Sequence, residues 1–199
     1  RFPSGTLAPL ASFLHKLGMK LGAYTDVGPK TCRGGRLGSW PYYQNDANVF
    51  ANWKLDMVKM DWCNHPHAFT QQQLYSNMSR ALNQTGHPML FNLCGWGLNK
   101  VWEWGPKIAQ SFRIGPDHIP VWWLPPAKQD PGQAGGTSNI IQHMAKLGKY
   151  ASNYAWNDPD FLEPGYEWNG FIEDRTAFSF WCLFAAPLMI ATDLRDLSN

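Results

Sequence analysis

The fold of this chain is constrained most by a regular alternation of short apolar runs with helical stretches. Six runs of β-strand type begin at Met19, Leu55, Pro88, Gln110, Tyr150 and Ala186. Stretches with helical spacing of apolar residues lie between or before them, at 7–17, 70–85, 137–147 and 170–184. One of these helices starts with a capping box formed by Thr70 and Gln73. A strand followed by a helix, repeated along a chain, predicts a parallel sheet.

A carboxylate or a thiol stands at the end of each apolar run. These residues are Asp26, Asp61, Cys94, Asp117, Asp158 with Asp160, and Asp193. Side chains from many strand ends converge on one mouth when the strands close into a ring, as in a (β/α)8 barrel. No glycine-rich phosphate loop follows the first run, which disfavours a dinucleotide-binding sheet. We therefore expect the α/β class and a (β/α)8 TIM barrel with six of its eight units visible, in one domain over residues 1–199.

Composition narrows the classes of function. Charged residues make up 16 % and hydrophobic residues 44 % of the chain, which is typical of a globular protein. The net charge of +2 comes without clusters of Lys or Arg, and no apolar run approaches the roughly 20 residues that span a bilayer, so neither nucleic acid nor a membrane is an expected partner. Sequons at Asn77 and Asn83 fit the secretory pathway, and hence a secreted, lysosomal or vacuolar protein.

The segment VKMDWCN places one carboxylate at the end of an apolar run. Asp61 follows Lys59 by two residues, so both side chains lie on the same face of a strand. An ammonium group beside a carboxylate favours the ionised form that a nucleophile requires. A structural ion pair that closes the top of a barrel would give the same pattern, so both interpretations stay open.

A second carboxylate lies in the segment FRIGPDH. A Gly-Pro turn separates Arg113 from Asp117 and is expected to move Asp117 into the loop layer, where a general acid could reach a leaving group. One ion-paired carboxylate and one loop carboxylate are the arrangement that glycoside hydrolysis needs. The alternative is an aspartate that only caps the following segment.

Two further segments offer substrate contacts, each with a structural alternative. Asp158 and Asp160 share a face if the strand continues, but Asn-Asp-Pro also initiates turns, so one of the two is expected to be structural. Trp96 could stack on a sugar ring, as the eleven Trp of the chain suit flat, partly apolar ligands, although a single Trp after a strand is more often part of the core.

The four cysteines lack the spacing of a structural zinc site. Cys32 and Cys63 each follow a run of strand type, where a bridge could join neighbouring loops. His65 and His67 could chelate a metal together with Cys63, but a third well-spaced ligand is missing and Cys63 has a better partner in Cys32. We therefore expect no metal and no cofactor.

Taken together, eight segments resemble glycoside hydrolase family 27, the α-galactosidases and α-N-acetylgalactosaminidases. They are RFPSG, LGAYTDVGPKTC, VKMDWC, LNQTG, LCGWG, RIGPD, WNDPDFL and AAPLMIATDLR, and they occur in the family's order and approximate spacing. The resemblance covers the whole chain. It implies an enzyme that hydrolyses terminal α-D-galactosyl residues with retention of configuration, and hence a carbohydrate as the binding partner.

The resemblance also implies a role for residues already singled out. Asp61 would be the nucleophile that forms a glycosyl-enzyme, and Asp117 would act first as acid and then as base. The residues that would line the sugar pocket are Tyr24, Lys59, Trp96, Arg113 and Asp160. Cys32 and Cys63 would be disulfide-bonded at the edge of this pocket.

The sequence departs from the family pattern in several places. The family's first two strands, which carry adjacent aspartates that hold the sugar's 4- and 6-hydroxyls, have no counterpart, and the β-sandwich domain that follows the barrel is absent. Gly95 stands where many relatives have a larger polar residue near the sugar's 2-position, which leaves the preference for a 2-substituent open. Ala109 stands where some relatives have a partner for Cys94, so Cys94 and Cys182 are expected to be free thiols.

These departures leave alternatives to an α-galactosidase. α-N-acetylgalactosaminidase or β-L-arabinopyranosidase activity would need only a change at positions that are lost or altered. A sugar-binding barrel without catalysis typically loses the nucleophile or the acid, whereas Asp61 and Asp117 are both present. An inactive fragment is the third alternative, because two strands of the barrel are missing.

Overall fold

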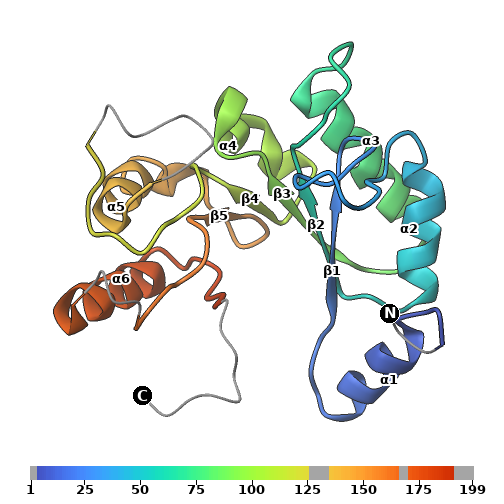
Figure 1. Cartoon of the computed structure of the whole chain (residues 1–199), viewed down its shortest axis with the longest axis horizontal. Helices are drawn as coiled ribbons and strands as arrows, with labels where there is room; N and C mark the ends of the chain where they lie inside the picture. The colour runs from blue at the N-terminus through green and yellow to red at the C-terminus, as the bar shows by residue number, and fades with distance from the viewer. Residues whose placement is uncertain (1–3, 126–134, 166–169, 191–199) are drawn as a thin grey trace. The chain divides into compact units, whose positions relative to one another are not determined.

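The structure, a computed structural model, describes residues 4–125, 135–165 and 170–190 (Figure 1). The strands are β1 (Gly22–Asp26), β2 (Met57–Asp61), β3 (Leu90–Cys94), β4 (Ser111–Arg113) and β5 (Trp156–Asp158). The α-helices are α1 (Ala8–Lys16), α2 (Tyr43–Asn52), α3 (Gln71–Gln84), α4 (Val101–Trp104), α5 (Thr137–Met144) and α6 (Phe171–Leu183). Short 3-10 helices are η1 (Leu98–Lys100), η2 (Gly105–Lys107) and η4 (Gly148–Tyr150).

Five of the six expected strands are present at the predicted places. They form one sheet in the order of the sequence, β1-β2-β3-β4-β5. The second half of the sixth, expected from Ala186, lies outside the described residues, as does Asp193. Within its described part, Ile190 forms a parallel β-bridge with Leu162. Among the helices of the described ranges, none combines the length and the apolar character needed to cross a membrane.

The chain divides into two compact units. The first contains Arg1–Cys94 and Lys107–Ser111, and the second contains Gly95–Pro106 and Phe112–Asn199. Strands β1, β2 and β3 therefore belong to the first unit, whereas β5 and most of β4 belong to the second.

In the first unit, three parallel strands are aligned so that their carboxyl ends coincide. The register pairs Asp26 with Asp61 and Asp61 with Cys94. Because side chains alternate along a strand, these three residues share one face of the sheet with Tyr24 and Lys59. The side chains of Tyr24, Asp26, Lys59, Asp61 and Cys94 therefore lie on one face of the sheet, toward the carboxyl ends of its strands.

The opposite face of these strands is covered by α2 and α3, which lie side by side (Figure 1). Tyr75 of α3 is fully buried, donates a hydrogen bond to the carbonyl of Met60 at 3.3 Å and packs its ring against Phe91. The N-terminus of α3 carries the predicted capping box, because Thr70 Oγ1 accepts from the N–H of Gln73 and Gln73 Oε1 accepts from the N–H of Thr70. The contacts of Tyr75 thus hold α3 against the face of the sheet opposite to Asp61.

In the second unit, β4 and β5 are joined through the N–H of Ile114, which donates to the carbonyl of Asp158 at 3.0 Å. Helix α5 buries Ile140, Ile141 and Met144. Trp181 of α6 is fully buried, and its indole N–H donates to the carbonyl of Asp160 at 2.9 Å. The loops after β4 and β5 are therefore held by the helices of the same unit.

Candidate active site

Asp61, the last residue of β2, is buried with both carboxylate oxygens held. Oδ1 accepts from the backbone N–H of Trp62 at 2.9 Å, and Oδ2 accepts from the hydroxyl of Tyr24 at 2.8 Å. Partial burial and the hydrogen bond to Asp61 both raise the pKa of Tyr24, so the phenol stays neutral and remains a donor. Lys59 lies on the same face, directly beside Tyr24 in the sheet register. The first unit thus brings Tyr24, Lys59 and Asp61 together on one face, which was expected for Lys59 and Asp61 from the alternation of side chains along the strand.

Asp26 is a second buried carboxylate beside Asp61, and the sequence identified it only as a strand end. Its side chain is fully buried and accepts the backbone N–H of Gly28, at 3.1 Å, and that of Cys63. Burial raises its pKa to about 7, with a further contribution from the charge of Asp61, against the opposing effect of these hydrogen bonds. No side-chain motif signals this role, because the donors are main-chain groups.

The predicted disulfide between Cys32 and Cys63 is present. Sγ of Cys32 lies 3.2 Å from Oδ2 of Asp61 and 3.4 Å from Oδ2 of Asp26. A sulfur in a disulfide carries no hydrogen, so these are packing contacts with the carboxylates. The bridge therefore touches the candidate nucleophile directly. Cys94 and Cys182 are free thiols, buried and exposed respectively, as expected.

In the second unit, a buried guanidinium organises the carboxylates. Arg113, the last residue of β4, is 1 % exposed. Its Nη2 lies 2.9 Å from Oδ2 of Asp160 and 3.2 Å from Oδ1 of Asp117, and it donates to the carbonyl of Pro116 at 2.7 Å. The side chain of Asp117 is 57 % exposed, so the Gly-Pro turn lifts it off the strand as predicted. Of the two carboxylates on Arg113, only Asp117 faces solvent.

The segment after β5 separates the two aspartates that the sequence could not rank. Oδ1 of Asp158 accepts the backbone N–H of Asp160 at 2.9 Å, which turns the chain at a residue with a φ of 84°. Asp160 is thereby directed to Arg113 and also accepts the N–H of His118 at 2.9 Å. This arrangement supports Asp158 as the structural member and Asp160 as the binding member of the pair.

Trp96 stands in a turn that lies close to Arg113. It is half-buried with a φ of 53°, and the N–H of the next residue, Gly97, donates to the carbonyl of Arg113 at 3.1 Å. Gly97 has a φ of 75°, and a Cβ there would lie 2.2 Å from the carbonyl oxygen of Ile114. Only glycine permits this close approach, which holds the turn of Trp96 in place.

His118 is a buried residue that the sequence reasoning missed. Its Nδ1 lies 2.8 Å from the carbonyl oxygen of Phe161 and its Nε2 lies 2.9 Å from the hydroxyl of Thr137. Because a carbonyl only accepts, Nδ1 carries the proton and Nε2 accepts from Thr137. Burial lowers the pKa of His118, which favours this neutral form. The imidazole thus pins the loop that carries Asp117 to the loop that carries Asp160.

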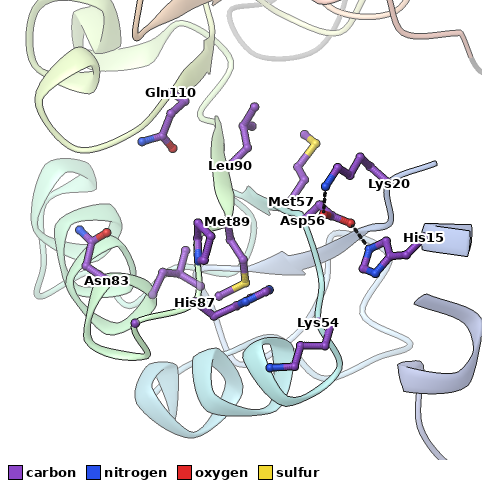
Figure 2. Close-up of a pocket in the computed structure, with 13 residues that line it drawn as sticks. His15, Lys20, Lys54, Asp56, Met57, Asn83, His87, Met89, Leu90 and Gln110 are labelled. Carbon is purple, nitrogen blue, oxygen red and sulfur yellow. Dashed lines mark hydrogen bonds and ion pairs between the residues drawn. The ribbon is translucent and has the colours of Figure 1, made fainter. Parts of the chain in front are cut away.

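A cavity of about 1260 Å³ lies in the first unit at the other end of the strands. Figure 2 shows His15 and Lys20 converging on Asp56, at 2.7 Å and 2.9 Å. Although burial opposes the shift, hydrogen bonds with the N–H of Leu21 and with the side chains of His15 and Lys20 lower the pKa of Asp56 to about 2. The cavity is separate from the strand ends that carry Asp61, so size alone does not identify the active site here.

His65 and His67, the two histidines that the sequence places close to Cys63, contact aromatic rings. His65 stacks on Trp62, and its ring meets His67 edge-on. Within the described residues, the group whose ligand atoms lie within 4.8 Å of one another consists of Asp26, Cys32, Asp61 and Cys63. With the disulfide closed, its sulfurs are not thiolates and the group offers only two carboxylates.

The strand-end carboxylates, the neighbouring disulfide and the buried arginine can be compared with known proteins. The family model described as Alpha galactosidase A, Melibiase_2, matches residues 1–199. The chain belongs to the Melibiase_2 family. Among curated relatives, the α-galactosidase A of Cellvibrio japonicus is 40 % identical over 202 residues, which span 100 % of the present chain and 48 % of that protein. The Melibiase_2 chain therefore spans about half the length of the curated relatives it matches.

Solved structures agree with this assignment. α-Galactosidase I from Mortierella vinacea superimposes with a TM-score of 0.88 at 33 % identity, over 97 % of this chain and 51 % of that one. The α-galactosidase of Saccharomyces cerevisiae with raffinose gives a TM-score of 0.89 at 32 % identity, over 98 % and 46 %. The parallel strands and alternating helices of the Melibiase_2 chain thus form part of a (β/α) barrel, which confirms the predicted fold class.

Proposed function

We propose that this chain carries the machinery of a retaining glycoside hydrolase that removes terminal α-D-galactosyl residues from oligosaccharides and glycoconjugates. The observation that carries the proposal is the environment of Asp61, a buried carboxylate at a strand end with each oxygen held by a hydrogen-bond donor. A nucleophile needs this fixed orientation, because the attack on the anomeric carbon has one productive direction. The 40 % identity to a curated α-galactosidase supports the choice of substrate.

Asp61 acts as the nucleophile in this mechanism. One carboxylate oxygen attacks the anomeric carbon, the bond to the leaving-group oxygen breaks, and a covalent glycosyl-enzyme forms. Tyr24 donates to Oδ2 and Trp62 to Oδ1, so the carboxylate cannot rotate away from the sugar. In a retaining enzyme the two carboxyl groups lie about 5 to 5.5 Å apart.

Asp117 acts as the acid and then as the base. It stands on a solvent-exposed loop, where a proton can be delivered to the departing oxygen and later taken from an incoming water. Arg113 holds this carboxylate from the strand end while it pairs with Asp160 at 2.9 Å. The exposed position suits a group that must change its protonation state in each half-reaction.

The remaining predicted pocket residues bind the sugar. Lys59, Arg113 and Asp160 supply charged hydrogen-bonding groups, Tyr24 a hydroxyl and Trp96 an aromatic face. A related yeast α-galactosidase has been solved with raffinose, an observation that supports a carbohydrate as the partner. The disulfide and the sequons at Asn77 and Asn83 support a secreted, lysosomal or vacuolar location.

The test separates the two carboxylates by their response to leaving groups and to azide. Asp61→Gly should not hydrolyse aryl α-galactosides with either good or poor leaving groups, and azide should give the inverted β-galactosyl azide. Asp117→Ala should keep the first step with an acidic phenol as leaving group, accumulate glycosyl-enzyme and, with azide, give the α-galactosyl azide. Product configuration is read by NMR.

Asp46→Asn is the matched control, because it removes a carboxylate from the first turn of α2 in the first unit. It should retain activity on both classes of substrate. Azide products of the opposite configurations from the two variants would reverse the roles of Asp61 and Asp117. Full activity of Asp61→Gly would refute the mechanism.

A further inference from the structure

Two carboxylates and one disulfide lie close together in the first unit. Glycoside hydrolysis does not use the sulfurs of this cluster. Ligand atoms of Asp26, Cys32, Asp61 and Cys63 all lie within 4.8 Å of one another. Opening the bridge would place two thiols beside two carboxylates. We propose that reduction of the Cys32–Cys63 disulfide creates a site for a thiophilic divalent cation such as Zn²⁺, with two thiolates and two carboxylates as ligands.

The segments that carry the two cysteines are held together without the disulfide. Nδ2 of Asn64, the residue after Cys63, donates to the carbonyls of Lys30 at 3.1 Å and Thr31 at 3.0 Å. Thr31 immediately precedes Cys32, so these hydrogen bonds join the two segments of the chain directly beside the bridge. They do not depend on the oxidation state of the sulfurs.

Close backbone packing makes the same connection. A Cβ on Gly28 would lie 2.2 Å from the carbonyl oxygen of Asn64 and 2.6 Å from that of Cys63, so the two loops meet with no room for a side chain. The carboxylate of Asp26 also accepts the N–H of Cys63. The sulfurs should therefore remain near the carboxylates after reduction, and the ligand set is pre-assembled.

The dimensions and the chemistry suit zinc. A tetrahedral Zn²⁺ binds thiolates at about 2.3 Å and carboxylates at about 2.0 to 2.2 Å, which requires ligand atoms that lie within a few ångströms of one another. Two thiolates and two ionised carboxylates repel one another because all four carry negative charge. A divalent cation bound between them offsets this repulsion. Thiolates select Zn²⁺ or Cd²⁺ over Mg²⁺ and Ca²⁺, which prefer an all-oxygen shell.

The bridge can be reached by a reductant, because Cys32 is exposed and Cys63 half-buried. A trialkyl phosphine gives two electrons to the S–S bond and becomes a phosphine oxide, while water supplies its oxygen and the two thiol protons. Zn²⁺ then displaces both thiol protons to solvent and forms two S–Zn bonds. Because Asp61 is one of the four ligands, the metal would also occupy the carboxylate to which the proposed function assigns nucleophilic attack.

Cadmium titration tests the site directly, since Cd²⁺ bound to thiolates gives a charge-transfer absorption in the ultraviolet. The chain is studied with Cys182→Ser, which removes the exposed free thiol. After reduction with the phosphine and anaerobic desalting, one equivalent of Cd²⁺ should bind, and Zn²⁺ should displace it. The oxidised chain should show no such band. This readout does not depend on catalytic activity, so it can fail or succeed independently of the proposed function.

Variants distinguish a four-ligand site from a pair of reactive thiols. Asp26→Asn and Asp61→Asn should each weaken Cd²⁺ binding by at least tenfold, whereas Asp46→Asn should leave it unchanged. Equal affinity in all three variants would overturn the carboxylate ligands. Loss of binding in Cys94→Ala with retention in Cys32→Ser would move the site to Cys94 and overturn the proposal.

The folding state is followed by near-ultraviolet circular dichroism during the same titration. If the reduced chain loses its tertiary signal, one equivalent of Cd²⁺ should restore it, because binding to a pre-assembled site favours the folded state. A reduced chain that binds no metal, whether folded or unfolded, would refute the proposal.

Discussion

Two buried carboxylates, Asp26 in the first unit and Asp160 in the second, are held by different means. Asp26 accepts a hydrogen bond from an uncharged donor, the backbone N–H of Gly28. In the second, Asp160 is held by the guanidinium of Arg113, which is itself almost fully buried. Uncharged donors leave a buried carboxylate sensitive to pH, whereas an ion pair makes each partner dependent on the other. The same kind of residue at a strand end should therefore respond differently in the two units.

The largest effect is expected from breaking the ion pair of the second unit. Arg113→Met leaves Asp160 buried without a cation, which should lower the free energy of unfolding by about 3 to 5 kcal/mol in urea titrations followed by tryptophan fluorescence. Adding Asp160→Asn should recover part of this loss, because the unpaired charge is removed. Arg175→Met, at an exposed position of α6, is the control and should cost little. A cost below about 1 kcal/mol for Arg113→Met would mean that Arg113 does not compensate this charge.

In the first unit, a smaller effect on the free energy of unfolding is expected, and it arises from a carboxylate that is not paired with a cation in this way. The pKa of Asp26 is raised to about 7 in the folded chain, mainly by burial and then by the charge of Asp61, so the unfolded chain releases its proton at lower pH. Stability from this group is fully present below about pH 4 and is lost as the pH rises to about 7, by about 2 to 4 kcal/mol. Asp26→Asn should flatten this part of the pH profile of the free energy of unfolding.

The control for Asp26 is Asp46→Asn, which should leave the slope between pH 4 and pH 7 as it is in the parent chain. An unchanged slope in Asp26→Asn would show that Asp26 is already ionised at low pH and that the hydrogen bonds from Gly28 and Cys63 outweigh its burial.

The smallest effect on the free energy of unfolding is expected from Asp117, which is compared with Asp160 in the same unit. Asp117 pairs with the same Arg113 at 3.2 Å, but its side chain is 57 % exposed. Asp117→Asn should therefore change the free energy of unfolding by less than about 1 kcal/mol, because solvent screens the pair. Thermal unfolding of Asp117→Asn beside Asp160→Asn measures the contrast. Equal losses in the two variants would mean that exposure does not separate the roles of these carboxylates.

The elements that local patterns encode were predictable from the sequence. Thr70 and Gln73 form the expected capping box, and the Gly-Pro turn places Asp117 outside its strand. Helix α2 gave no such signal, because its N-cap residue, Tyr42, makes no side-chain hydrogen bond. The locations of the five strands followed from the apolar runs, but their starting residues did not: β5 begins at Trp156, whereas its run begins at Tyr150. The pairing of Cys32 with Cys63 came from the family resemblance and is present in the structure.

The interactions that the sequence could not reveal join positions far apart in the chain. His15 pairs with Asp56 across 41 residues, and the N–H of His118 reaches Asp160 across 42. Asp26 depends on main-chain donors, whose direction is set by the fold and not by residue type. For the same reason the environments of Asp158 and Asp160, two residues apart, could be told apart only in three dimensions.

Asp56, which pairs with Lys20 just before β2, and Asp26, at the end of β1, differ in their charge at mildly acidic pH. For Asp56, a pKa of about 2 means that its contribution to stability persists until the medium becomes strongly acidic, and is lost only as the pH falls through that value. Asp26, at the carboxyl end of the neighbouring strand, instead takes up a proton well before that point. Mild acidification therefore neutralises Asp26 while Asp56 keeps its charge, so the distribution of charge along the strands of the first unit changes with pH.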